Sequence, residues 1–294
     1  MNFYREDAHM LRHIMANRKL CVAVVAAILG LAVGSGTQLR ASDILTDLSS
    51  TVQVYSQSDA GIGSWSVNGV NELSREWFWY STGAVGSANP EKSIDTLSCT
   101  LDSPSDTNAN PGYDTLNQEF TKSGQFKVDL AYVLTGSNGT GSELSLQISI
   151  TNLGSQALNF HWYQLGNFGL GGSSGLDVAQ AGVNGHGYYI TASEQNGGLS
   201  VVTSLNPGAN RAQVNLHPTV YNLLTGTQGS NLNNSAGPIG PGNIDSAFQW
   251  DLTIPSNGTT SILETQSMSL TVVPEPATLC LLALGGLALL RRKN

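Results

Sequence analysis

Apolar and polar side chains alternate along residues 126–151, and this two-residue period is the strongest structural signal in the chain. A period of two places successive side chains on opposite faces of the backbone, as in a β-strand. A Gly-rich stretch at 136–141 interrupts the alternation and supplies a flexible turn. The pattern therefore predicts a long β-hairpin. Its apolar positions are Phe126, Val128, Leu130, Tyr132 and Leu134 on the first strand, and Leu144, Leu146, Ile148 and Ile150 on the second.

Other short apolar stretches are separated by turns rich in Gly, Asn and Ser. They predict strands at 51–55, 76–81, 94–101, 158–165, 187–192, 199–203, 213–216, 247–254 and 261–272. So many strands favour an all-β fold, and we expect a single large antiparallel two-sheet β-sandwich over residues 42–272. Short helices are expected only at 43–48, with Ser42 as the N-cap, and at 219–224, after Pro218.

The body of the chain is acidic. Between residues 42 and 273 there are five basic residues against 18 acidic residues, a net charge of −13, and the other basic residues lie near the two ends. Such a body repels a phosphate backbone, so we expect no binding to nucleic acid.

Residues 1–41 have the organisation of a secretory signal peptide with a signal helix. Arg18 and Lys19 precede an uncharged apolar run at 20–33, which is followed by small and polar residues. The run is shorter than the roughly 17 residues that a membrane-spanning helix needs. We therefore expect export by the general secretion machinery. Met15 would give a more compact basic region, which makes it an alternative start of the protein.

The C-terminal residues 273–294 contain three parts in a fixed order. The first is Val273, Pro274, Glu275 and Pro276, an extended spacer because two prolines within three residues continue neither a strand nor a helix. An uncharged apolar segment at 277–290 follows, and the chain ends with Arg291, Arg292, Lys293 and Asn294. The apolar segment predicts a short transmembrane anchor helix. The basic residues after it should remain on the cytoplasmic side of the membrane.

This arrangement resembles the PEP-CTERM sorting signal of exopolysaccharide-associated bacterial proteins. The resemblance implies an exosortase substrate: an integral-membrane cysteine transpeptidase would recognise the Pro-Glu-Pro motif and remove the helix and the basic tail. The protein would be anchored transiently in the inner membrane through 277–290, then released as a secreted, cell-surface or matrix protein of a biofilm. An uncleaved tail anchor is the alternative interpretation.

Aromatic residues on two predicted strands are candidates for glycan binding. Trp77 and Trp79 share one face of their strand, while Trp162 and Tyr163 lie on opposite faces of theirs. Exposed Trp and Tyr rings can stack on sugar rings, which would suit a protein that contacts exopolysaccharide. The alternative is that these rings are buried between the sheets, where aromatic side chains dominate core energetics.

One loop offers oxygen atoms at alternating positions, as a calcium-binding loop does. Its candidate ligands are Asp106, Asn108, Asn110 and Asp114. The loop departs from the EF-hand pattern because Pro111 replaces the required glycine. Asp and Asn also favour turns by bonding to their own backbone, so we expect no cofactor and retain calcium as the alternative.

The sequence features are compatible with three functions. The first is a non-enzymatic exported surface or matrix protein, for which no catalytic residues are assigned. The second is a carbohydrate-binding module for exopolysaccharide. The third is a secreted glycan-active hydrolase whose carboxylates converge only in the folded protein.

Overall fold

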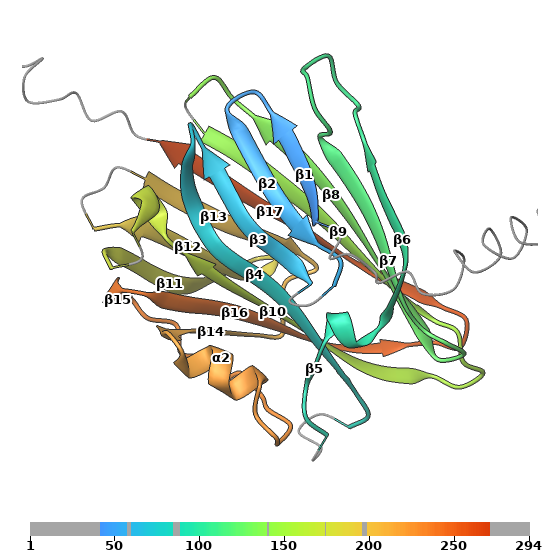
Figure 1. The fold of residues 1–294 in the computed structure, drawn as a ribbon. Coiled ribbons are helices and arrows are strands. Elements are labelled where there is room, and N and C mark those ends of the chain that lie inside the picture. Colours follow the sequence, from blue (N-terminus) through green and yellow to red (C-terminus); the bar gives the residue numbers. More distant parts are fainter. Residues whose placement is uncertain are drawn as a thin grey trace, which may run out of the picture. The chain divides into compact units, whose positions relative to one another are not determined.

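The computed structural model describes residues 42–270 except 58–59, 85–88, 140, 174 and 196–198. These residues form two antiparallel sheets packed face to face, as predicted (Figure 1). We call them sheet A and sheet B.

Sheet A has the strand order β1-β2-β3-β4-β10-β16-β14, with the short β5 paired to β4. Its strands are β1 (Ser42–Asp47), β2 (Ser50–Tyr55), β3 (Gly61–Val67), β4 (Val70–Thr82), β5 (Lys92–Ser93), β10 (Leu158–Phe168), β14 (Arg211–Leu216) and β16 (Ile244–Ile254). The strands β4, β10 and β16 are long and central, and they carry most of the residues discussed below.

Sheet B has the order β15-β11-β12-β13-β17-β9-β8-β7-β6. Its strands are β6 (Ser98–Ser105), β7 (Thr115–Lys122), β8 (Phe126–Gly136), β9 (Gly141–Asn152), β11 (Asp177–Asn184), β12 (Gly187–Glu194), β13 (Leu199–Asn206), β15 (Ile239–Gly242) and β17 (Thr259–Leu270). The predicted hairpin is confirmed as β8 and β9, which pair from Phe126 with Asn152 to Gly136 with Ser142.

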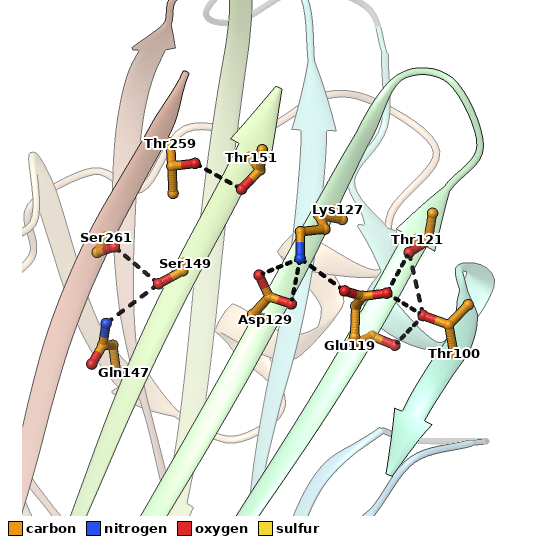
Figure 2. Close-up of polar contacts among 10 residues, drawn as sticks. All are labelled: Thr100, Glu119, Thr121, Lys127, Asp129, Gln147, Ser149, Thr151, Thr259 and Ser261. Carbon is orange, nitrogen blue, oxygen red and sulfur yellow. Dashed lines mark hydrogen bonds and ion pairs between the residues drawn. The ribbon is translucent and has the colours of Figure 1, made fainter. Parts of the chain in front are cut away.

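The outer face of sheet B is polar, as expected for a strand face in contact with water. Hydroxyl groups pair across β9 and β17: Ser149 lies 2.9 Å from Ser261, and Thr151 lies 2.8 Å from Thr259 (Figure 2). Inward-facing residues of the same strands, such as Ile148 and Ile150, are fully buried. The alternation read from the sequence therefore separates the core side from the solvent side.

Helical structure is scarce in the described residues. The predicted helix at 219–224 is confirmed as α2 (Thr219–Leu224), and two short 3-10 turns occur at η1 (Ile94–Thr96) and η2 (Leu170–Gly172). No helix within the described residues is long and apolar enough to cross a membrane.

The helix predicted at 43–48 is wrong. Residues 42–47 form the edge strand β1, which pairs with β2 through a tight turn at Leu48, whose φ is 50°. The short segment has alternating burial, with Leu45 and Asp47 facing inward. A six-residue helix has little stability of its own, so pairing with β2 and burial of Leu45 decide the conformation.

Aromatic side chains fill the centre of the sandwich. Phe78 on β4 stacks on Trp162 on β10 with ring centroids 5.4 Å apart, and Tyr80 packs against Phe126 and Phe160. Buried aromatic groups contribute large apolar areas and favourable ring geometry. This core holds the central strands rigidly, so side chains on the opposite face of sheet A project from a fixed surface.

Candidate functional site

The outer face of sheet A carries a second apolar cluster, separate from the interior core. Strand pairing places Trp77, Leu165 and Ala247 side by side on β4, β10 and β16. The helix α2 packs on this row through the buried side chains Val220 and Leu224 and runs beside β14 and β16 (Figure 1). One edge of the covered region is polar and reaches solvent.

Asp245 is fully buried at this polar edge, and both of its carboxylate oxygens accept hydrogen bonds. Oδ1 accepts from Asn167 Nδ2 at 3.1 Å and from His217 Nδ1 at 3.0 Å. Oδ2 accepts from the backbone N–H of Tyr221 at 3.2 Å. The carboxylate therefore fixes the imidazole of His217 and the first turn of α2 in one geometry.

His217 is held through one ring nitrogen, and its side chain remains partly exposed. The side chain is 26% exposed, and its Nε2 has no hydrogen-bond partner among the described residues. When the neutral imidazole donates its Nδ1–H to the carboxylate of Asp245, Nε2 is left as an acceptor. The buried carboxylate of Asp245 thus orients a partly exposed imidazole, whose Nε2 can accept a hydrogen bond from a hydroxyl group.

Three partly exposed side chains form a row of contacts that begins at His217: Tyr221, then Trp77, then Arg75. The rings of Trp77 and Tyr221 lie 5.7 Å apart, and the rings of Tyr221 and His217 lie 6.1 Å apart. The guanidinium carbon of Arg75 lies 4.5 Å from the centre of the Trp77 ring. We call Arg75, Trp77, His217 and Tyr221 the α2 rim.

The α2 rim combines donors, an acceptor and apolar rings in a small area. Arg75 offers N–H donors, His217 offers an acceptor, and the two aromatic rings offer apolar faces and edges. This combination suits a ligand that presents hydroxyl groups beside an apolar C–H face.

The four aromatic residues proposed from the sequence differ in their exposure to solvent. Trp162 is completely buried between the sheets, which excludes stacking on a sugar from solvent. Trp79 and Tyr163 face outward from sheet A but are only 4% and 2% exposed, because α2 and the segment after it cover them. Only Trp77 retains a partly exposed ring, so the burial alternative describes the other three.

His161 lies on the same face of sheet A but is closed to ligands. It is 3% exposed, and its Nδ1 lies 2.7 Å from Asp251 Oδ1 while its Nε2 lies 3.1 Å from the carbonyl oxygen of Gly83. Both nitrogens are occupied, so His161 acts as a buried structural link.

The proposed calcium loop is stabilised by its own N–H groups. Asp114 is buried and accepts from Thr107 N at 2.8 Å and from Asn108 Nδ2 at 2.7 Å. The oxygen of Asn108 accepts from Asn110 N at 2.6 Å, and Asp106 accepts from Asn108 N at 3.3 Å. Within the described residues no group of three or more His, Cys, Asp or Glu residues could hold a metal ion. A plain turn stays the expectation for this loop, with calcium binding as the alternative.

Two buried carboxyl groups lie in the interior, facing each other from the two sheets. Gln266 Nε2 donates to Glu76 Oε2 and, at 2.9 Å, to Glu264 Oε1, and Gln164 Nε2 donates to Glu264 Oε2 at 2.5 Å. Burial, and then repulsion from Glu264, raises the pKa of Glu76 well above its usual range. Burial also raises the pKa of Glu264 to about 7. The adjoining cavity of about 10 Å³ has room for about one water molecule and none for a sugar.

A second acidic group lies beside η2. Asp177 on β11 pairs directly with Glu194 on β12, and Glu72 on β4 accepts a 2.6 Å hydrogen bond from Gly171 N. Burial raises the pKa of Asp177 to about 7, the backbone of Leu170 offsets part of this shift, and Glu194 and Glu72 add to it. Burial therefore favours the protonated form of Asp177 in the folded protein.

No local sequence pattern predicts that Arg75, His217, Tyr221 and Asp245 lie together. The predicted helix at 219–224 places Tyr221 four residues after His217, which was the one local signal available. Asp245 joins them only through the pairing of β16 with β10 and β14, which no local pattern encodes.

Comparison with known families identifies the C-terminus. Residues 272–293 match the PEP-CTERM protein-sorting motif. The chain carries this sorting signal. It indicates an exported protein that an exosortase processes and that is sorted to the cell surface. The predicted signal helix at 1–41 and the predicted anchor helix at 277–290 lie outside the described residues, as do the Pro-Glu-Pro segment at 273–276 and the basic residues at 291–293.

No curated protein sequence matches the chain. Among solved structures, a galactose mutarotase-like protein from Clostridium acetobutylicum is 8% identical, with a TM-score of 0.51 over 78% of this chain and 95% of that chain. A similar protein from Lactobacillus casei is 7% identical, with a TM-score of 0.50 over 78% of this chain and 100% of that chain. A bacterial glucoamylase, solved in complex with acarbose, is 11% identical, with a TM-score of 0.53 over 85% of this chain and 36% of that chain. At these identities the likeness shows a shared β-sandwich fold.

Proposed function

We propose that the protein is an exported surface or matrix protein whose sandwich binds carbohydrate through the α2 rim. In this proposal residues 1–41 direct secretion, and 277–290 hold the precursor at the inner membrane until an exosortase acts at Pro274, Glu275 and Pro276. Residues 42–272 then remain as the mature body, in contact with exopolysaccharide.

The observation that carries the proposal is the pair of partly exposed rings, Trp77 and Tyr221, together with His217 next to Tyr221, whose Nε2 has no partner among the described residues. Sugars present hydroxyl groups and apolar C–H faces together, and the rim supplies partners for both. The sandwich fold shared with sugar-processing proteins is compatible with this proposal and supplies no residue to it.

The hydrolase alternative has weaker support in the geometry. The close pair Glu76 and Glu264 lies in the interior, and the adjoining cavity of about 10 Å³ does not admit a sugar ring. The carboxylate that lies behind the α2 rim, Asp245, is fully buried, and both of its oxygens are already bonded. We therefore propose binding without hydrolysis.

The test is a glycan array with the full-length chain in mild detergent, followed by titration of the best neutral oligosaccharide. We expect Tyr221→Leu and His217→Gln each to weaken binding about tenfold or more. The matched control is Tyr113→Leu, since Tyr113 is 51% exposed and bonds to Thr46 on β1, at the opposite edge of sheet A from β14. Equal affinity in all three variants would show that sugars do not bind at the rim.

A further inference from the structure

A second concave region lies at one end of the sandwich, where β4 approaches the end of β7. The pocket has a volume of about 420 Å³ and is lined by Tyr80, Ser81, Thr82, Asn89, Lys92 and Lys122. Small-molecule sites commonly have volumes of ~300–1,000 Å³, so this pocket is large enough for a sugar residue. It shares no residue with the α2 rim, and the nearest members of the two sites on β4, Tyr80 and Trp77, are three residues or about 10 Å apart along the strand.

The charge of this pocket is opposite to that of the body. Residues 42–272 carry a net charge of −13, yet two of their five basic residues, Lys92 and Lys122, line this one pocket. An isolated positive site in an acidic surface attracts an anion locally while the surroundings repel polyanions of high charge density. The ligand expected here therefore has sparse negative charge.

The other three basic residues of the body are engaged within the protein. Lys127 lies 2.8 Å from Glu119 and 3.1 Å from Asp129 on the outer face of sheet B (Figure 2). Arg75 lies over Trp77, and Arg211 donates to the carbonyl oxygen of Leu232 at 3.4 Å.

Lys92 and Lys122 differ from Lys127 and Arg211 in having no oxygen partner among the described residues. Neither ammonium group has an ion pair or a hydrogen bond with the described residues, and Lys122 Nζ lies 5.9 Å from the centre of the Phe126 ring. An ammonium group left without a carboxylate is free to bind an external anion.

The remaining lining groups favour a sugar acid over a simple ion. Thr82 contributes a hydroxyl group, and Asn89 contributes an amide, whose Nδ2 lies 3.4 Å from the carbonyl oxygen of Thr82. These neutral donors and acceptors match ring hydroxyl groups, while the lysines match one negative group. We propose that this pocket binds a carboxylate-bearing sugar residue of a polysaccharide, with Lys92 and Lys122 holding the carboxylate.

The experiment compares affinities of the full-length chain in mild detergent for oligogalacturonate and for the neutral oligogalactoside of the same length. We expect Lys92→Gln combined with Lys122→Gln to weaken oligogalacturonate binding at least tenfold and to reduce its salt dependence. The matched control is Lys127→Gln, which removes one positive charge from a different face and should change the affinity less than twofold. Amide hydrogen exchange or thermal melting is used to check that each variant is folded.

Three outcomes would overturn the inference. These are unchanged oligogalacturonate affinity in the double variant, equal weakening by Lys127→Gln, and full displacement of the oligomer by equimolar inorganic sulfate. The last outcome would identify a general anion site. The inference is independent of the α2 rim, because Tyr221→Leu and His217→Gln should leave oligogalacturonate binding unchanged whether or not the rim binds neutral sugars.

Discussion

Glu76 on sheet A and Glu264 on sheet B share one hydrogen-bond donor, the Nε2 atom of Gln266. Both carboxyl groups are buried, and no lysine or arginine is among their hydrogen-bond or ion-pair partners in the described residues. A charge in such a site has lost its hydration without gaining an opposite charge. The interior of the sandwich therefore favours protonated carboxyl groups.

The first prediction is that the protein becomes less stable as pH rises from about 4.5 to about 7. The pKa of Glu264 is about 7 in the folded protein, against 4.5 as its ordinary value, so the folded state retains a proton that the unfolded state releases. The contribution of Glu264 to the free energy of unfolding is therefore complete below about pH 4.5. It falls by roughly 3 kcal/mol as the pH rises to about 7. Burial of Asp177 acts in the same direction. Urea unfolding at a series of pH values measures the slope, and a rise in stability over this window would contradict the assignment.

The second prediction is that Glu76→Gln stabilises the protein at pH 8 and flattens its pH dependence. The new amide keeps an oxygen to accept from Gln266, and its N–H group can reach an acceptor, since the side-chain oxygens of Gln164 and Gln266 are buried without partners. Removing a buried charge should increase the free energy of unfolding by about 1–3 kcal/mol. Glu143→Gln, at an exposed position, is the control and should have little effect.

The third prediction concerns the different roles of His161, on β10, and His217, which directly follows β14. His161→Gln removes two buried hydrogen bonds and should lower the free energy of unfolding by about 1–3 kcal/mol without changing sugar affinity. His217→Gln should lower it by less than about 1 kcal/mol, because Asp245 keeps its bonds to Asn167 and Tyr221, yet it should weaken sugar binding. Urea unfolding and calorimetric titration of both variants provide the measurements. The reverse pattern would mean that His161 is the ligand-binding histidine.

The fourth prediction concerns the loop at 106–114. Since its oxygens already accept hydrogen bonds from the loop, millimolar calcium should shift the melting temperature by less than about 1 °C. Asp114→Ala should destabilise the protein by about 1–3 kcal/mol equally with calcium and with a chelator. A calcium-dependent increase in melting temperature that disappears in Asp114→Ala would instead establish the calcium site.

The fifth prediction addresses sorting. Deleting residues 273–294 removes the matched sorting motif, and we expect a folded body that is secreted but no longer retained by cells. Fractionation of the native host followed by immunoblotting measures the distribution. A control with Arg291, Arg292 and Lys293 changed to Gln keeps the apolar segment and should accumulate as an unprocessed membrane form. Membrane retention of the deleted form would show that another segment anchors the protein.

Local sequence was sufficient for the sandwich, the β8–β9 hairpin, α2 and the sorting signal. Each of these features is encoded by residues close together in the chain: alternating hydrophobicity at 126–151, a helix start after Pro218, and three consecutive elements at the C-terminus. The edge strand at 42–47 was mispredicted because its conformation depends on pairing with β2 rather than on its own six residues.

Tertiary structure alone decided which side chains are available to a ligand. The sequence placed Trp77 and Trp79 on the same face of one strand, but only packing by α2 determines that Trp79 is buried while Trp77 reaches solvent. The same holds for Asp245 with His217 and for Lys92 with Lys122, which come from separate strands and loops. Local periodicity fixes the direction of a side chain relative to its own strand, whereas exposure and proximity depend on elements that are distant in the chain.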